Sequence, residues 1–129
     1  AIHSGWLGTV RQIVDHTIRY LIEKENCNPK EMYCLIGPCL SKKHLEVQDD
    51  VINQVKKMNF DTSPFYQKTD ETHYLLDNKG LNKQQLLNLG VLEENIQVSS
   101  YCTNENNDLF FSHRVNHDGQ RNVTIIKRK

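Results

Sequence analysis

Ile2-His3-Ser4-Gly5-Trp6-Leu7-Gly8 is the stretch around which the chain is organised, because it delivers an imidazole directly before a glycine-punctuated turn. Glycine lets the backbone bend tightly at positions 5 and 8, and Trp6, the single tryptophan, can anchor the bend in a core. We expect Trp6 to be buried, so that Trp6→Ala lowers the stability by roughly 3 to 5 kcal/mol. Such a turn would hold His3 in a fixed orientation.

The residues after this turn predict a long amphipathic helix. From Thr9 onward, apolar side chains recur at spacings of three and one and form a single stripe. Thr9 and Gln12 fit a capping box at the start, and the helix should end near Asn26, before Pro29. His16 lies off the stripe and should face solvent.

Short apolar runs predict strands. The run 32–36 is typical of a buried strand, and the run 96–99 is typical of a second one. Near the end of the chain, the turn signal Asp118-Gly119 predicts a hairpin that leads into a final strand at 123–126.

Two further helices are expected between these strands. Asp49 or Asp50 can cap the first, whose inner face consists of Val51, Ile52, Val55 and Met58. Asp77 can cap the second, which runs from about Asn78 to Leu89 and ends at Gly90.

Helices that alternate with short strands, followed by a terminal hairpin, predict the α/β (α+β) class: a layered α/β domain with a mixed β-sheet. The segment 60–72 has no period and should be a loop. With 129 residues the chain is one domain or part of one. The apolar pair Ala1-Ile2 is too short to form a strand by itself, but it lies where the end of a strand would precede His3.

Composition limits the classes of partner. Sixteen basic and sixteen acidic residues cancel, so broad electrostatic capture of nucleic acid is not expected. No apolar run approaches the roughly 18 residues of a membrane span, and no signal-peptide pattern opens the chain, so we expect a soluble, cytoplasmic protein. The four cysteines, at 27, 34, 39 and 102, include no C-x-x-C pair and should be free thiols.

Several motifs resemble those of one known family in the same order. They are His3-Ser4-Gly5-Trp6-Leu7-Gly8, Ile36-Gly37-Pro38-Cys39, Leu45-Glu46-Val47, Leu76-Asp77, Leu87 to Val91, Tyr101-Cys102-Thr103 and Phe110-Phe111-Ser112-His113-Arg114. On these motifs the chain is similar to the YfiH-like laccase-domain family, also called multicopper polyphenol oxidases or purine nucleoside phosphorylases. The resemblance implies an α-β-α layered fold in which residues 1–129 are the C-terminal portion of a single domain.

The resemblance also implies a zinc site of two histidines and one cysteine. Such a site would act on purine nucleosides, by phosphorolysis with inorganic phosphate or by adenosine deamination. His3 corresponds to one of the three ligands, and the other two would lie outside this chain. Because a catalytic zinc needs about three protein ligands and an open position for water, we expect the chain by itself to hold no stoichiometric zinc.

Two substrate contacts are expected near the end of the chain. Arg114 is a candidate contact for an anion or a base, with a surface salt bridge as the alternative. Phe111 could stack on a purine, but Phe110 and Phe111 on one strand would face opposite sides, so one of them would fill the core. The family usually has a basic residue at the position of Leu7 and an Arg-Asp pair at Val115-Asn116, so these departures weaken the inference of phosphorolysis.

Two other patterns carry reactive side chains. His113 and His117 have the i,i+4 spacing of a metal pair on a helix, but in a hairpin that spacing has no special meaning. Cys39 follows Gly37-Pro38 in a loop that contains lysines, and a nearby ammonium group could lower its pKa and make it nucleophilic. A half-buried structural role is the favoured alternative for Cys39.

Two rival functions are also considered. A copper-dependent polyphenol oxidase is one alternative, because histidine and thiolate ligands bind copper tightly, although the sequence has no His-x-His pair. The second alternative is an inactive fragment or a degenerate partner-binding module, which the unmatched ligand at His3 favours. The sequence does not indicate an oligomeric state.

Overall fold

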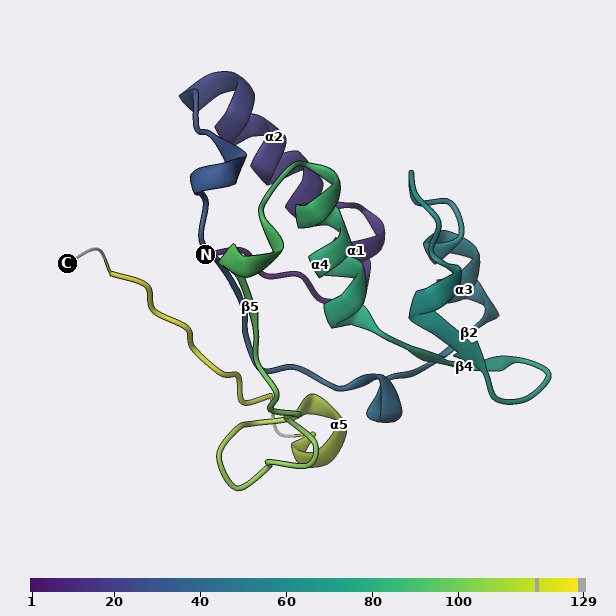
Figure 1. The fold of residues 1–129 in the computed structure, drawn as a ribbon. Helices are drawn as coiled ribbons and strands as arrows, with labels where there is room; N and C mark the ends of the chain where they lie inside the picture. Colours follow the sequence, from purple (N-terminus) through teal and green to yellow (C-terminus); the bar gives the residue numbers. More distant parts are fainter. Residues whose placement is uncertain (118, 128–129) are drawn as a thin grey trace.

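The computed structural model describes residues 1–117 and 119–127. The helices are α1 (Trp6–Val10), α2 (Ile13–Glu25), α3 (Asp49–Val55), α4 (Asn78–Asn88) and α5 (His113–Asn116). The strands are β1 (Cys34–Ile36), β2 (Glu46–Gln48), β3 (Tyr66–Lys68), β4 (His73–Leu76) and β5 (Ile96–Val98), and short 3₁₀ turns include η2 (Lys42–His44) and η3 (Ser63–Phe65). In Figure 1, α1, α2 and α4 form one group, and α3 lies with β2 and β4 in another.

The strands form two sheets. β1 and β5 pair in parallel, with Cys34 opposite Ile96 and Ile36 opposite Val98. β2, β4 and β3 form an antiparallel sheet with β4 in the middle. The predicted α/β (α+β) class, with both kinds of strand pairing, is confirmed. In the described residues the parallel and antiparallel pairings belong to separate sheets.

The long helix predicted from Thr9 is divided in two, so its predicted start and capping box are wrong. α1 already begins at Trp6, and α2 begins at Ile13, after Gln12 takes a left-handed conformation with φ of 55°. Thr9 is fully buried within α1, because its hydroxyl belongs to a polar network with α4. The reversal at Gln12 allows α1 and α2 both to lie against α4.

The remainder of that helix prediction is confirmed. Val14 and Ile18 on the apolar stripe are buried, His16 is exposed, and the helix ends at Asn26, where φ is 53°. The buried stripe of α2 forms the first of two core clusters together with Leu86, Val91 and Ile96.

The second core cluster joins α3 to the antiparallel sheet. As predicted, the inner face of α3 is buried, and it packs with side chains of β2 and β4: Val51, Ile52, Val55 and Met58 against Val47, Tyr74 and Leu76. The residue that precedes the helix as its N-cap is Gln48, not Asp49 or Asp50, and it makes no side-chain capping bond. Both acidic residues instead lie in the first turn, where they complement the helix dipole.

The predicted ends of α4 are confirmed. The side chain of Asp77 accepts a hydrogen bond from the backbone N–H of Gly80 at 2.9 Å, which satisfies one of the donors that a helix start leaves free. Gly90 follows the helix with φ of 87°, a conformation that glycine adopts without steric cost.

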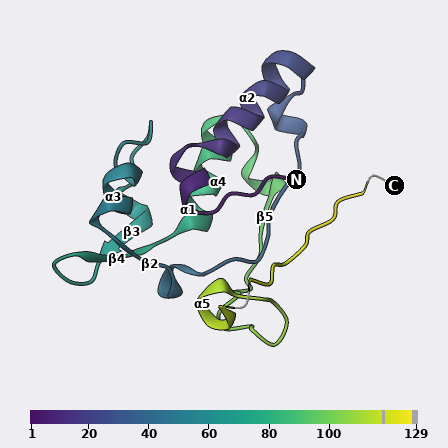
Figure 2. The ribbon, with the colours of Figure 1, turned by 180° about the vertical axis from the view of Figure 1, so that it is seen from behind.

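Three sequence predictions about strands are corrected. β1 is not a buried strand, since Leu35 is 64% exposed and nothing in the described chain covers its outward side. The segment 60–72 is not only a loop, because it contains η3 and the edge strand β3, whose Tyr66 packs edge-on against Tyr74. Residues 123–126 form no strand and are exposed, and both views show this part of the chain running apart from α2 and α4 (Figures 1 and 2). Asp118 of the predicted turn lies outside the described residues.

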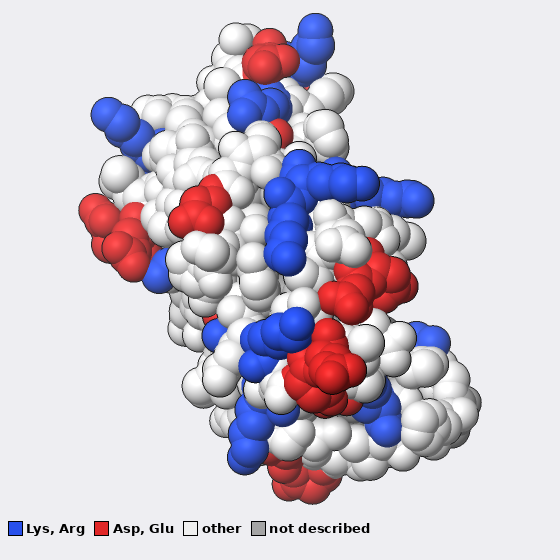
Figure 3. All heavy atoms as spheres, turned by 90° about the vertical axis from the view of Figure 1, so that its right-hand side faces the viewer, with Lys and Arg blue, Asp and Glu red and all other residues white. Residues whose placement is uncertain are grey.

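Charged side chains of both signs are interspersed over the face shown in Figure 3, consistent with the net charge of zero. Among the described helices, none combines the length and the apolar composition that crossing a membrane would require.

Candidate functional site

His3 lies in the segment before α1, with its ring folded back over Gly5. A Cβ added at position 5 would lie 3.2 Å from Nε2 of His3, which is closer than side chains normally approach. The absence of a side chain at Gly5 therefore makes room for the imidazole. His3 is exposed, so its imidazole can be reached from solvent.

A polar network fastens this segment to α4. Ser4 Oγ donates a hydrogen bond to Asn82 Oδ1 at 2.7 Å, and Asn82 Nδ2 donates to Thr9 Oγ1 at 3.0 Å. Asn78 Nδ2 donates to the carbonyl of Ser4 at 3.0 Å. Both asparagines and Thr9 are buried, so these bonds are shielded from competing water. These bonds of Ser4 thereby hold the neighbouring His3 at a defined place beside α4.

The sequence analysis missed this network, although α4 carries a signal for it. Asn78, Asn82 and Gln85 recur at i, i+4 and i+7, which places them on one face of a helix. Gln85 is 1% exposed and its Oε1 accepts a hydrogen bond from the N–H of Asp15 at 3.1 Å. A polar stripe at helical spacing indicates a buried polar contact when apolar residues flank it on the same helix.

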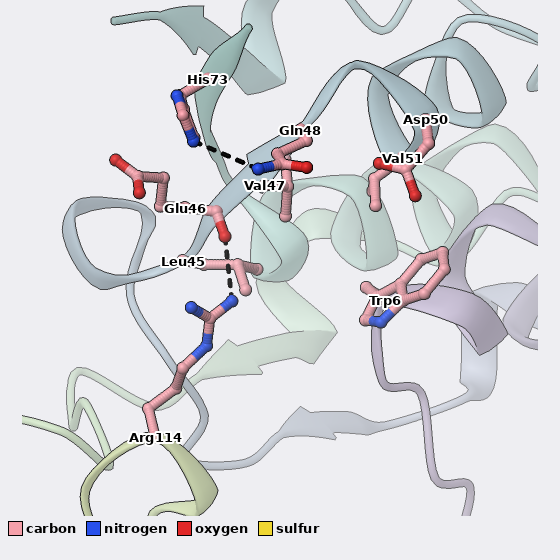
Figure 4. A pocket seen from close by; sticks show the side chains of 9 residues that line it. All are labelled: Trp6, Leu45, Glu46, Val47, Gln48, Asp50, Val51, His73 and Arg114. Carbon is pink, nitrogen blue, oxygen red and sulfur yellow. Dashed lines mark hydrogen bonds between the residues drawn. The ribbon is translucent and has the colours of Figure 1, made fainter.

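Trp6 borders two cavities. One, of about 560 Å³, is lined by His3, Leu7, Arg11 and Ile13 as well as Trp6. The other, of about 320 Å³, lies between Trp6, β2 and Arg114 (Figure 4). The expectation that Trp6 is buried is wrong: the residue is 38% exposed, because its indole lies between these two open cavities and not in either core cluster.

Arg114 reaches the second cavity from α5. Its guanidinium NH2 donates a hydrogen bond to the carbonyl of Glu46 at 2.9 Å (Figure 4). The surface-salt-bridge alternative is not observed, since none of the ion pairs among the described residues includes Arg114. The remaining N–H groups of a guanidinium stay available to an anion or a base in the cavity.

His73, at the start of β4, lines the same cavity. Its Nδ1 lies 2.9 Å from Asp70, and the hydrogen bond and negative charge of that carboxylate raise the pKa of His73. A second cationic group therefore faces the cavity when His73 is protonated. Glu46 and Asp50 also contribute acidic side chains to its lining.

Phe111 is not brought to either cavity. It is 45% exposed, and its backbone pairs with the side chain of Asn122 through bonds of 2.9 and 2.7 Å. Phe110 instead packs on Tyr101, with ring centroids 5.6 Å apart. The prediction that the two phenylalanines lie on one strand is wrong. Phe110 is nevertheless packed and Phe111 is exposed, so only one of the two rings packs against another ring.

One cluster of possible metal ligands occurs among the described residues. His44, Cys102 and Glu105 each offer a ligand atom, and these atoms lie within 4.8 Å of one another. His3 has no such companions in the described chain. His113 and His117 do lie at α5 and not in a hairpin, with ring centroids 6.1 Å apart, but no third donor from residues 1–117 or 119–127 joins them.

The four cysteines are free, as predicted. Burial raises the pKa of the Cys39 thiol and outweighs the opposite effect of the nearby Lys79 ammonium group. Cys39 therefore fits the half-buried structural role better than that of a nucleophile. Burial also raises the pKa of Cys102, but hydrogen bonds from Ser41 and from the backbone of Asn104 and Glu105 outweigh it and lower that pKa to about 7.

Comparison with known proteins gives a consistent result. Residues 1–129 match the family model described as multi-copper polyphenol oxidoreductase laccase. The chain is 38% identical over 112 residues to purine nucleoside phosphorylase YlmD of Bacillus subtilis, which covers 87% of this chain and 40% of that protein. It is 34% identical over 129 residues to a purine nucleoside phosphorylase of Staphylococcus epidermidis, covering 98% of this chain and 47% of that protein. The chain thus spans less than half the length of these relatives.

Solved structures share the fold. The Bacillus licheniformis hypothetical protein YfiH matches with a TM-score of 0.84 and 33% identity over 87% of this chain and 42% of that one. YlmD from Geobacillus stearothermophilus matches with a TM-score of 0.81 and 35% identity, with the same coverage. With its motifs, its fold and its full-length match to the family model, the chain belongs to the YfiH-like laccase-domain family.

Proposed function

We propose that His3 is a metal ligand in a zinc-dependent enzyme that cleaves purine nucleosides with inorganic phosphate. Several relatives in the family carry the name purine nucleoside phosphorylase, which supports this substrate class and reaction. The proposal places the enzyme in the cytoplasm, where free thiols such as the four found here stay reduced.

The observation that carries the proposal is the sharing of Trp6 between two cavities. The first cavity contains His3 and the second contains Arg114, 111 positions later in the chain. A substrate that spans Trp6 would meet a metal ligand at one end and a cation at the other. A purine nucleoside together with phosphate has the matching chemistry, because it combines a planar apolar base with an anion.

Arg114 would bind and orient the phosphate in this arrangement. Its fork of donors matches the geometry of phosphate oxygens, and a protonated His73 would add a second positive charge. These two groups offset the loss of the basic side chains that the family has at the positions of Leu7 and Val115. The negative charges of Glu46 and Asp50 would repel an anion elsewhere in the cavity, so that only an anion in direct contact with the guanidinium of Arg114 would bind.

The metal needs ligands beyond this chain. His3 is a single imidazole without nearby donors among the described residues, so it cannot form a high-affinity site alone. The proposal requires a longer protein that adds about two further ligands. Bound zinc would supply a Lewis acid there, and Gly5 with the Ser4–Asn82 bond would hold the His3 ring in its orientation.

The decisive experiment compares His3→Ala with wild type in the longer protein. Base release from inosine or adenosine should require added phosphate and should fall by at least about 100-fold in the variant, with loss of one zinc by elemental analysis. His16→Ala is the matched control, because His16 is an exposed histidine on α2 and should change neither quantity.

Other outcomes would replace the proposal. Ammonia release from adenosine without phosphate would indicate deamination, and copper-dependent oxidation of a phenol would indicate a polyphenol oxidase. Full activity and full zinc content in His3→Ala would remove His3 from the site.

A further inference from the structure

A group of three donor side chains lies outside the cavities that border Trp6. His44 ends the turn η2, while Cys102 and Glu105 belong to the loop after β5. Although 58 positions separate His44 from Cys102, their ligand atoms and that of Glu105 lie within 4.8 Å of one another. The two cavities and His3 do not contribute to this group.

The sulfur of Cys102 is already held in place. The residue is 2% exposed, and its Sγ accepts a hydrogen bond from the backbone N–H of Ser41 at 3.3 Å. Its own backbone N–H donates to Asn106 Oδ1 at 3.2 Å, and a β-bridge joins it to Cys39. A ligand that is preorganised in this way loses little freedom when a metal binds.

The two other donors lie on the solvent side of the sulfur. His44 Nε2 and Glu105 Oε1 are 2.9 Å apart, and their side chains are 26% and 47% exposed. The hydrogen bonds from His44 and Lys43 hold the pKa of Glu105 below its usual range, so its carboxylate is ionised at neutral pH. Lys43 approaches Glu105 at 3.3 Å, but its side chain is 76% exposed and free to move away from an incoming cation.

We propose that His44, Cys102 and Glu105 bind one divalent transition-metal ion of the zinc class. A thiolate, an imidazole and a carboxylate are the donors that zinc takes, at about 2.3 Å from sulfur and about 2.0 to 2.2 Å from nitrogen or oxygen. Magnesium and calcium prefer oxygen ligands alone, so the sulfur selects against them. To hold the ion, Nε2 of His44 and Oε1 of Glu105 would move slightly apart from 2.9 Å and turn toward the sulfur, which leaves a tetrahedral site with one open position.

The ion would join two segments that are distant in sequence. η2 leads directly through Leu45 into β2, where the carbonyl of Glu46 accepts the bond from Arg114. A metal between η2 and the loop 102–105 would therefore stiffen one wall of the Arg114 cavity. This inference goes beyond the proposed function, and it revises the expectation that the chain by itself holds no zinc.

Cobalt titration in the presence of a non-thiol reductant tests the site. The protein carries His3→Ala throughout, so that any metal held through His3 is removed. We expect one equivalent of Co²⁺ to produce the near-ultraviolet thiolate-to-cobalt band, and one equivalent of Zn²⁺ to abolish it. Cys102→Ser should lose the band, whereas Cys39→Ser should keep it, because Cys39 is the neighbouring half-buried thiol and is not in the group.

His44→Ala provides the second variant, since its partly exposed side chain can be removed without opening a core. Zinc affinity should fall by at least about tenfold in this variant, measured by competition with a chromophoric chelator. A cobalt band that persists in Cys102→Ser would overturn the proposal, as would the absence of a band in the folded His3→Ala background. Failure of the nucleoside activity would leave this result unaffected, because neither measurement depends on turnover.

Discussion

The hydroxyl of Ser4 donates a hydrogen bond of 2.7 Å to the amide oxygen of Asn82, so that the residue next to His3 is tied to a helix 78 positions away. The same asparagine donates to Thr9 and to the carbonyl of Asn78, and its side chain is buried. One buried amide thus fixes the glycine turn, α1 and α4 relative to one another.

Asn82→Ala should lower the free energy of unfolding by about 2 to 4 kcal/mol, because it removes the bonds of a buried amide to the half-buried hydroxyl of Ser4 and to the buried hydroxyl of Thr9, which then keep only the bonds between Ser4 and Thr9. Urea denaturation measures the change. Asn88→Ala is the control on the same helix, where the side chain is exposed and the loss should stay within about 0.5 kcal/mol. Equal losses in the two variants would show that the network contributes nothing specific.

Trp6→Ala should cost about 1 to 2 kcal/mol, less than a buried aromatic would, because Trp6 is 38% exposed. Leu76→Ala should cost about 2 to 5 kcal/mol, since Leu76 is 0% exposed in the second core cluster. Chemical denaturation gives the ranking, and the emission of the single tryptophan should be red-shifted relative to that of a buried indole. The reverse ranking would mean that the turn depends on Trp6 as a core residue.

Gly80→Ala should destabilise the protein by about 1 to 3 kcal/mol although alanine is the better helix former. The added Cβ would lie 2.6 Å from both Asp77 Oδ2 and Phe65 Cδ1, so the capping carboxylate and a packed ring must shift. The helix-propensity gain of about 1 kcal/mol is smaller than these two costs. Gly37→Ala is the control, because its Cβ would meet no atom within 4 Å. Thermal unfolding that shows Gly80→Ala to be stabilised would contradict the close packing described here.

His73 should titrate above its ordinary pKa of about 6.5, because Asp70 stabilises the imidazolium. The hydrogen bonds from the backbone of Thr72 and from His73 lower the pKa of Asp70, so the carboxylate is charged throughout this range. The stabilisation from the pair is fully present below the unfolded pKa of His73 and is lost as the pH rises through the raised folded value.

NMR titration of the His73 ring measures this shift. Asp70→Asn should return the midpoint to near its ordinary value, and the stability difference between wild type and variant should shrink above that pH. His16, an exposed histidine on α2, is the internal reference. An identical midpoint in wild type and Asp70→Asn would refute the pairing.

If the proposed function is correct, Arg114→Ala should raise the KM for phosphate by about 10-fold to 100-fold in the longer protein that the proposal requires, the effect of losing a charged hydrogen bond, while the metal content stays unchanged. Arg121→Ala is the control, since this exposed guanidinium bonds the neighbouring carbonyl of Gln120. Steady-state kinetics with elemental analysis makes the comparison. Unchanged kinetics would leave Arg114 as a tie between α5 and β2 only.

Local features of the sequence were sufficient for several elements. The apolar stripe of α2, the inner face of α3 and the cap at Asp77 depend on residues a few positions apart, and each was predicted. A helical period and a capping side chain act within one or two turns of the backbone, so the sequence contains the information in one short window. A short apolar run has no such repeated local signal, and whether it forms a strand depends on a partner strand elsewhere in the chain. The prediction of a strand at 123–126 was wrong for this reason.

The sequence by itself therefore determined the class of the fold, most helices and, through the order of its motifs, the family, while the role of His3 stays a prediction. Only the tertiary structure decided the break at Gln12, the exposure of Trp6 and Leu35, and the meeting of His44 with Cys102. Each of these depends on which distant segment lies against the residue. Burial and ligand geometry arise from packing between distant segments, and the periodicity of apolar residues within one segment does not indicate which other segment packs against it.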